Sequence, residues 1–226
     1  MQHTHTTPNG INVKVCGMTQ MAQIQELAEI GVQFMGMIYY PKSPRYVYNF
    51  LKPENIKAIN NINKVGVFVN ASAEEVIKTV DECRLHMVQL HGDETPKFCE
   101  KIADYISVVK VFRISEGDNI RWRIKDYIDV CDMFLFDTDG ANFGGTGKKF
   151  SWDILADIDI PKPYFLSGGI EPSDVGNINQ FLQTPSAKNL FSLDINSKFE
   201  TAPGIKDMAL VKHFFNEIDT LHKPCF

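Results

Sequence analysis

Residues 64–92, KVGVFVNASAEEVIKTVDECRLHMVQLHG, hold two short apolar runs on either side of a helical pattern. The runs are Lys64–Val69 and Met87–Leu90, and a run that is apolar on both faces is typical of a covered parallel strand. The segment between them, Ala73–Arg84, follows Ser72, a good N-cap residue, and has acidic residues in its first turn. The stretch therefore predicts a strand, a helix and a second, parallel strand.

The same unit recurs along the whole chain of 226 residues, giving eight apolar runs in all. They are Val13–Cys16, Phe34–Tyr39, Lys64–Val69, Met87–Leu90, Val108–Phe112, Met133–Phe136, Tyr164–Leu166 and Asn189–Leu193. Eight strand–helix units favour an α/β fold of the single-domain (β/α)8 TIM barrel type, for which about 250 residues are typical. A doubly wound open sheet is the alternative, and it would not pair the first run with the last. We expect one domain over residues 1–226, with residues 1–11 as a loosely ordered N-terminal extension.

Composition excludes several classes of protein. The net charge is −5, and no basic stripe points to nucleic acid. No apolar run approaches the roughly 18 residues of a membrane helix, and the polar start does not resemble a signal peptide. The five cysteines are odd in number and form no C-x-x-C, so we expect a reduced, cytoplasmic protein without a disulfide framework. No histidine and carboxylate cluster has metal-ligand spacing, so we expect no metal.

The active site of such a fold lies at the carboxyl ends of its strands, where this chain places Cys16. Strand side chains alternate, so Lys14 and Cys16 point into the barrel and Val13 and Val15 face the helices. A neighbouring cation lowers the pKa of a thiol, which predicts a thiolate base or nucleophile near neutral pH. The alternative is a buried cysteine beside a lysine that pairs with a carboxylate.

Two carboxylates end inward-facing rows of side chains. Asp137 follows Leu135 on the inner face of its strand, where it can be kept protonated and act as a general acid. The alternative is an aspartate that is satisfied by Lys14 or by a cap. Asp194 shares a face with Ser192, with Phe191 on the opposite face, and is a candidate for binding substrate hydroxyls.

Three loops are candidates for contact with a small-molecule substrate. Gly144 and Gly145 lie in GGTGKK, which matches neither a Walker loop nor a dinucleotide fingerprint, so we expect a loop over the site rather than a nucleotide site. Gly168 and Gly169 follow the seventh run, and Asn196 and Ser197 follow the eighth. In barrels these two loops commonly bind phosphate through backbone N–H groups.

Other strand ends supply further polar side chains. Arg45 follows Ser43-Pro44 and offers a planar fork for a carboxylate, although a solvated arginine is the simpler alternative. Gln89 and His91 share a face at the fourth strand end and are candidates for substrate binding. A lone histidine is nevertheless more often structural than catalytic.

Taken together, these motifs resemble phosphoribosylanthranilate isomerases. The start Lys14-Val15-Cys16-Gly17-Met18-Thr19 is similar to the family's K-[IV]-C-G-[IL]-T, and Ser43-Pro44-Arg45 to its S-x-R. Further matches follow in the family's order: Val65–Asn70, Val88–Gly92, Gly144–Gly147, Phe150–Trp152, Leu166–Ile170 and Pro203–Asp207. Each motif is weak alone, but eight in order over nearly the whole chain are highly specific.

The resemblance implies a cofactor-free (β/α)8 enzyme of tryptophan biosynthesis. It would convert N-(5′-phosphoribosyl)anthranilate to 1-(2-carboxyphenylamino)-1-deoxyribulose 5-phosphate by an Amadori rearrangement. It also implies Cys16 as general base, Asp137 as general acid and Arg45 as the group that holds the anthranilate carboxylate. We expect a monomer rather than a homodimer.

One position departs from the family, whose eighth loop commonly reads D-V-S-S-G-V-E. Lys198 stands where that glycine is expected, and a strained φ would cost more without glycine. Two other functions remain open. A different phosphosugar barrel enzyme would need metal ligands or another lysine and glutamate set, and a non-catalytic phosphate binder would have no use for Cys16 and Asp137.

Overall fold

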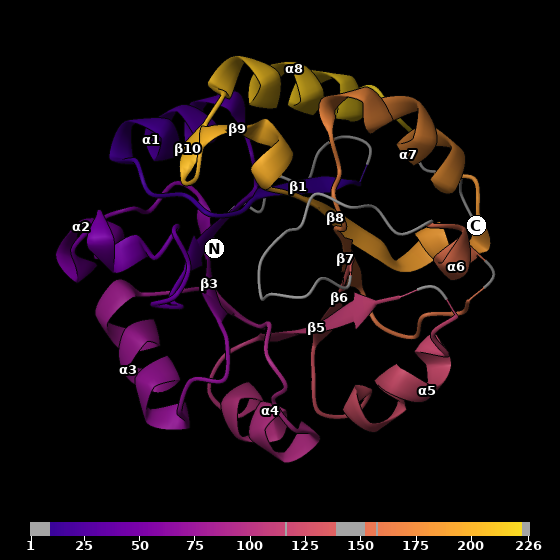
Figure 1. Ribbon diagram of the computed structural model, residues 1–226, viewed down its shortest axis with the longest axis horizontal. Helices are drawn as coiled ribbons and strands as arrows, with labels where there is room; N and C mark the ends of the chain where they lie inside the picture. The colour runs from indigo at the N-terminus through magenta and orange to yellow at the C-terminus, as the bar shows by residue number, and fades with distance from the viewer. Residues whose placement is uncertain (1–9, 116, 139–151, 157, 223–226) are drawn as a thin grey trace.

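The computed structural model describes residues 10–115, 117–138, 152–156 and 158–222 of the chain, and its eight main strands form one closed parallel barrel (Figure 1). The strands are β1 Asn12–Val15, β2 Phe34–Ile38, β3 Asn63–Phe68, β4 Met87–Leu90, β5 Val108–Ile114, β6 Met133–Thr138, β7 Tyr164–Leu166 and β8 Leu190–Ile195. Strand β1 pairs with both β2 and β8, with Lys14 opposite Asp194. The expected (β/α)8 barrel is therefore confirmed, and the open sheet is excluded.

Helices surround the barrel in chain order, as Figure 1 shows. They are α1 Met21–Ile30, α2 Pro53–Lys57, α3 Ala73–Cys83, α4 Pro96–Ala103, α5 Ile120–Ile124, α6 Asp153–Ala156, α7 Val175–Phe181 and α8 Met208–Asp219. Short 3-10 turns include η3 Pro172–Asp174 and η5 Ser197–Phe199, and a small antiparallel pair joins β9 Glu200–Ala202 to β10 Ile205–Lys206. The expected cap of α3 is present, since the Ser72 hydroxyl accepts from the backbone N–H of Glu75.

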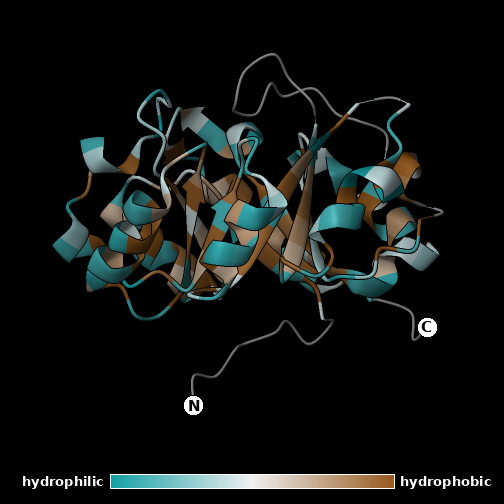
Figure 2. Cartoon of the chain, turned by 90° about the horizontal axis from the view of Figure 1, so that it is seen from below, coloured by the Kyte–Doolittle hydropathy of each residue, from teal (hydrophilic) through white to brown (hydrophobic). Residues whose placement is uncertain are grey.

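The core has two parts, and Figure 2 shows the hydrophobic residues concentrated in the central strands. A large outer layer fills the space between strands and helices and includes Val13 and Val15. A smaller inner cluster fills the barrel itself with Val109, Val111, Leu135 and Phe165. The outer layer attaches the helices, and the inner cluster supports the polar residues above it.

The predicted alternation of side chains holds in β1 and β6 but fails in β8. Phe191 packs inside the barrel, with its ring centroid 5.5 Å from that of Phe34 and 5.4 Å from that of Phe165. The β7–β8 register shifts at this point, so that β8 carries one extra residue. The expectation that Phe191 faces away from Asp194's side of the strand is therefore wrong, because the irregularity resets the alternation.

The start of the described chain is anchored in the fold. Residues 1–9, most of the expected N-terminal extension, lie outside the described residues. Ile11 is fully buried in the outer core layer. The described fold therefore begins immediately before β1.

Candidate active site

Cys16 follows β1 directly and faces into the barrel, as its spacing from Lys14 predicts. Its backbone N–H donates to Ile195 O on β8 at 2.9 Å, and the residue is buried. Gly36 on β2 makes room for it, since an added Cβ there would lie 2.7 Å from Cys16 Sγ and 3.1 Å from Lys14 Cε. A glycine on the neighbouring strand thus creates the space that the thiol occupies.

Lys14 is fully buried and forms an ion pair with Asp194. The Lys14 Nζ to Asp194 Oδ2 distance is 2.8 Å, across the seam where β1 meets β8. A buried ammonium needs such a partner, because an unpaired charge in the interior is costly. The pairing predicted as the alternative for Lys14 is therefore present, and its partner is Asp194. Asp194 Oδ1, by contrast, is buried with no hydrogen-bond partner among the described residues.

Burial raises the pKa of the Cys16 thiol above its usual value. The Lys14 ammonium acts in the opposite direction and Asp194 adds to the rise. Lys14 thus lowers the thiol pKa as predicted, but removal from water outweighs this effect, so the predicted thiolate near neutral pH is not the favoured form of the resting site. The resting site favours the neutral thiol.

Asp137 ends the inner row of β6, as predicted. Its Oδ2 lies 3.4 Å from His91 Nε2, and its Oδ1 accepts the backbone N–H of Thr138 at 2.9 Å. Burial acts to raise the pKa of Asp137, but the His91 and Thr138 contacts hold it below the usual value of an aspartate. The expectation of a carboxyl kept protonated is therefore wrong for the resting site, where the ionised form is favoured.

Gln89 and His91 stand together at the end of β4. Gln89 Nε2 lies 3.0 Å from His91 Nδ1. When that nitrogen accepts from the amide N–H, the ring carries its proton on Nε2, the nitrogen that faces Asp137. The histidine that sequence patterns class as structural therefore lies beside the candidate acid.

Arg45 lies in the loop after β2, over the turn that follows Cys16. An added Cβ at Gly17, whose φ is +75°, would lie 2.7 Å from Arg45 Cδ. The Arg45 side chain is not solvated: Nε donates to Glu200 at 2.9 and 3.1 Å, and Nη2 donates to Glu200 Oε2 at 2.5 Å. One edge of the guanidinium is thus fixed by a carboxylate from the eighth loop.

Glu200 and Lys206 are the site residues that sequence reasoning missed. Lys206 Nζ lies 2.8 Å from Glu200 Oε1 and 2.7 Å from Asn196 Oδ1, and Lys206 is buried. Both residues fall inside quoted family motifs, but no periodicity assigns them a role. The one sequence signal that could have indicated them is that each is a charged residue inside a motif shared with the family.

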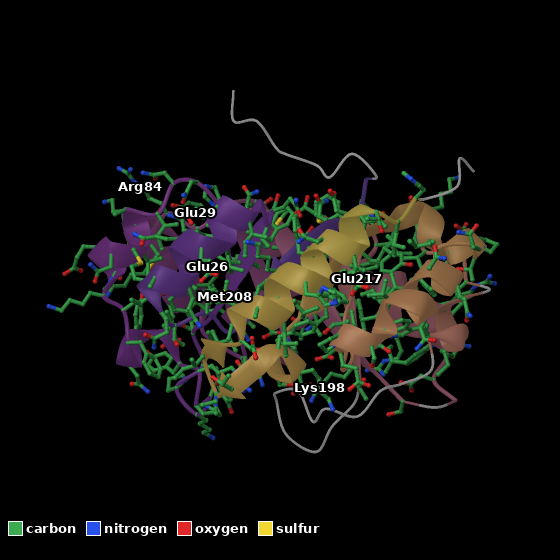
Figure 3. All side chains as sticks on the ribbon, turned by 90° about the horizontal axis from the view of Figure 1, so that it is seen from above. Glu26, Glu29, Arg84, Lys198, Met208 and Glu217 are labelled. Atoms are coloured by element: carbon green, nitrogen blue, oxygen red, sulfur yellow. The ribbon has the colours of Figure 1, made fainter. Side chains whose placement is uncertain are left out.

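The two expected phosphate loops lie side by side at the carboxyl ends of β7 and β8. Gly168 and Gly169 have φ of +91° and +75°, conformations that favour glycine. Lys198 Nζ lies 3.6 Å from Glu171 Oε2 and so links the eighth loop to the seventh. Figure 3 shows Lys198 at the opposite edge of the molecule from Arg84, which caps the C-terminal end of α3.

Lys198 does not carry the expected strain. The non-glycine residues with positive φ in the described chain are Asn70 and Arg84. The strain expected from replacing a glycine is therefore absent, because this loop takes the ordinary conformation of a 3-10 turn. Gly144 and Gly145, the other predicted loop residues, lie outside the described residues.

Two other kinds of feature are absent from the described residues. No group of three or more histidine, cysteine, aspartate or glutamate side chains there could hold a metal ion. Among the same residues, no helix combines the length and apolar character needed to cross a membrane.

Comparison with known sequences identifies relatives over nearly the whole chain. The family model described as N-(5′-phosphoribosyl)anthranilate (PRA) isomerase matches residues 13–217. The N-(5′-phosphoribosyl)anthranilate isomerase of Phocaeicola vulgatus is 40% identical over 207 residues, covering 91% of this chain and 97% of that protein.

Solved structures give the same result. The phosphoribosyl anthranilate isomerase of Thermotoga maritima superposes with a TM-score of 0.79 at 31% identity, covering 93% of this chain and 100% of that one. A phosphoribosyl anthranilate isomerase in complex with reduced 1-(o-carboxyphenylamino)-1-deoxyribulose 5-phosphate gives 0.75 at 28% identity, with the same coverage. The chain belongs to the N-(5′-phosphoribosyl)anthranilate isomerase family.

Proposed function

We propose that this chain isomerises N-(5′-phosphoribosyl)anthranilate to 1-(2-carboxyphenylamino)-1-deoxyribulose 5-phosphate, a step of tryptophan biosynthesis. Family membership supports the reaction, and a related structure holds a reduced form of this product. The observation that carries the proposal is the arrangement of one barrel mouth. A buried thiol stands directly after β1, and a carboxylate in contact with a histidine stands near the end of β6, both at the carboxyl ends of the barrel strands.

The first chemical step opens the ribose ring. Asp137 in its acid form donates its proton to the ring oxygen as the C1′–O bond breaks, and the nitrogen lone pair forms the C1′=N bond of a protonated Schiff base. His91 Nε2–H donates to Asp137 and holds the carboxyl group in place. The carboxylate left after transfer is the form that this environment favours.

The second step moves a proton from carbon. The Schiff base withdraws electrons and acidifies the C2′ proton, which the Cys16 thiolate removes to give an enolamine. The enolamine then tautomerises to the 2-ketone: the Cys16 thiol gives the proton it took from C2′ to C1′, which restores the thiolate. The C2′ hydroxyl gives up its own proton, which returns Asp137 to the acid form. No external oxidant or reductant is needed, because the reaction only redistributes protons and electrons within the substrate.

Catalysis by Cys16 as the base and Asp137 as the acid requires that the one proton shared by the two groups reside on Asp137. The resting site favours a thiol at Cys16 and a carboxylate at Asp137, whereas the reactive form has a thiolate and a carboxylic acid. Both forms contain the same number of protons. The reactive form is therefore a tautomer of the resting one, and its fraction stays constant between the two pKa values.

Substrate binding uses groups from several loops. We assign the phosphate to the backbone around Gly168 and Gly169 and to Ser197, with Asn196 beside it, and the anthranilate carboxylate to Arg45. We assign the sugar hydroxyls to a set of inward-facing side chains. They are Gln89, His91 and Asp194, supported from below by Lys14. Gly144 and Gly145 stay proposed as loop contacts.

We further propose that one copy of the chain suffices for catalysis and that it works in the cytoplasm. All the side chains assigned above come from a single chain. A relative from Thermotoga maritima is described as dimeric, so size-exclusion chromatography with light scattering is the appropriate test. A monomer that turns over substrate supports the proposal, and activity confined to a dimer contradicts it.

The function is tested by following the fluorescence of freshly prepared phosphoribosylanthranilate as purified protein is added. We expect loss of the anthranilate signal in proportion to enzyme, with formation of the carboxyphenylamino product. No acceleration above the spontaneous decay of the substrate contradicts the assignment. Binding by calorimetry without conversion would favour a non-catalytic ligand binder instead.

A further inference from the structure

The guanidinium of Arg45 is held along one edge and left open along another. A guanidinium offers two forks, a side edge made by Nε and one terminal nitrogen, and an end edge made by both terminal nitrogens. Glu200 occupies the side edge of Arg45, through Nε and Nη2. The end edge includes Nη1, which has no hydrogen-bond partner among the described residues, so this edge can take a second planar carboxylate.

Glu200 is itself fixed from three directions. Besides Arg45, its Oε1 accepts from Lys206 Nζ at 2.8 Å and from the backbone N–H of Gly204 at 3.1 Å. Its side chain is only 4% exposed, and burial raises its pKa less than Arg45 and Lys206 lower it, so the carboxylate stays ionised. A carboxylate held this firmly determines the position of the arginine that it binds.

The charge balance of this cluster differs from that of the other buried ion pairs. Lys14 with Asp194 and Lys110 with Glu94 are one-to-one pairs, at 2.8 and 2.7 Å. Glu200, by contrast, is shared by two cations, Arg45 and Lys206. The cluster therefore carries one surplus positive charge beside Cys16, and this favours an incoming anion.

We propose that Glu200 is a positioning residue, which orients the end edge of Arg45 toward the carboxylate of the substrate while Lys206 holds Glu200 in place. This inference rests on the proposed function and deepens it. It assigns a task to the eighth loop that is separate from phosphate binding, since Glu200 lies beyond the η5 turn that begins at Ser197. It also explains why Arg45 and Glu200, 155 residues apart, meet over the turn after Cys16.

The test compares two ligands that differ in the carboxyphenyl group. Reduced 1-(2-carboxyphenylamino)-1-deoxyribulose 5-phosphate carries the carboxylate, and ribulose 5-phosphate lacks it. In Glu200→Gln we expect the affinity for the first to fall by about 10- to 100-fold, the range for a hydrogen bond to a charged group. The affinity for the second should change less than about threefold, and KM should rise more than kcat falls.

Glu94→Gln is the matched control, because Glu94 is also a buried carboxylate paired with a lysine. It should lower the melting temperature without changing the ratio of the two affinities. Glu200→Asp keeps the charge but shortens the reach, and it should weaken the carboxylate ligand selectively even if Glu200→Gln does not fold. Adding Arg45→Lys to Glu200→Gln should cause little further loss, because the two residues act as one unit.

The outcomes separate the two proposals. If the native protein does not convert phosphoribosylanthranilate, the proposed function fails. If it converts the substrate but folded Glu200→Gln and Glu200→Asp variants bind the two ligands with an unchanged affinity ratio, the positioning role of Glu200 alone is overturned. Equal weakening of both ligands has the same meaning, since it indicates a general structural role.

Discussion

The two sides of the barrel mouth are built in different ways. Around Cys16, at the ends of β1, β2 and β8, three cations and two carboxylates form interlocked ion pairs. Around Asp137, at the ends of β4 and β6, the main contact is a single histidine, backed by the phenylalanine rings of β6 in the outer core. The side around Cys16 is dominated by buried ion pairs, and the side around Asp137 by the contact between one carboxylate and His91.

This difference indicates how the work is divided. The charged side can bind an anion without moving, because its cations are already held in place by buried carboxylates and one positive charge is in surplus. The side around Asp137 has a carboxylate whose ionisation depends on its contacts with His91 and Thr138, which suits a group that must change its protonation state. Variants on the two sides should therefore fail in different ways.

The largest expected effect is on turnover, when either candidate proton-transfer group is removed. Cys16→Ala and Asp137→Asn should each lower kcat by at least about 10²- to 10⁴-fold, the usual contribution of a positioned acid or base. Steady-state assays with circular dichroism would measure rate and folding together. Cys83→Ala, which removes a buried thiol in α3, is the control and should keep its rate per folded molecule. Near-native activity in either site variant would rule out the assigned mechanism.

The next largest effect concerns stability and tests the fixed charges of the Cys16 side. Asp194→Asn leaves the Lys14 ammonium buried without a charged partner, which should cost about 3–5 kcal/mol of unfolding free energy. Urea titration measures this directly. Glu94→Gln should cost a similar amount at Lys110, yet only Asp194→Asn should also lose activity in its folded fraction. Equal activity of the two folded variants would contradict a role for Asp194 at the site.

The pH dependence of kcat/KM sharpens the contrast between the sides. Activity requires one proton to be shared between Cys16 and Asp137, so it falls below the pKa of Asp137 and above that of Cys16. Because the first pKa is lowered and the second is raised, the plateau should be wider than for an ordinary aspartate and thiol pair. A narrow bell centred on neutral pH would contradict these environments.

Replacing His91 should then narrow the plateau from the acid side. Without the hydrogen bond from His91, burial dominates and the pKa of Asp137 rises, so in His91→Asn the acid limb moves to higher pH. His213→Asn, which breaks an exposed pair with Glu217, should leave the profile unchanged. If the acid limb of the His91→Asn profile does not move, His91 does not set the pKa of Asp137.

The smallest effect is expected at the rim. Lys198 and Glu171 form a partly exposed ion pair with a 3.6 Å separation, and such pairs contribute at most about 1 kcal/mol. Lys198→Gly should change stability by less than this and alter inhibition by inorganic phosphate by less than about fivefold. A loss of phosphate inhibition larger than this would show that Lys198 itself binds the anion.

The period-two pattern of the strands predicted most of the architecture and the placement of single residues. Lys14, Cys16 and Asp137 face inward as their spacing requires, because alternation is a local property of the backbone. The pattern failed at Phe191, where contacts with Phe34 and Phe165 across the barrel accompany a shifted register.

The charges and proton states of the site could not be predicted in the same way. Glu200 reaches Arg45 across 155 residues, so no local pattern contains the pair. The direction of each pKa depends on how burial competes with neighbours from other strands. For Cys16 burial prevails, and for Asp137 the contacts of His91 and Thr138 prevail. Residue types therefore predicted the candidate reacting groups, and only the assembled barrel set their protonation.

The seam between β1 and β8 also has a consequence for how the protein is made. Lys14 leaves the ribosome 180 residues before Asp194, its carboxylate partner, and β1 has no neighbour on one edge until β8 is synthesised. A nascent chain that carries only the first seven strands cannot bury that ammonium in its final place without an uncompensated charge. The barrel therefore closes, and Lys14 beside Cys16 gains its carboxylate partner, only after β8 has been synthesised. A partly synthesised chain thus lacks the complete candidate active site.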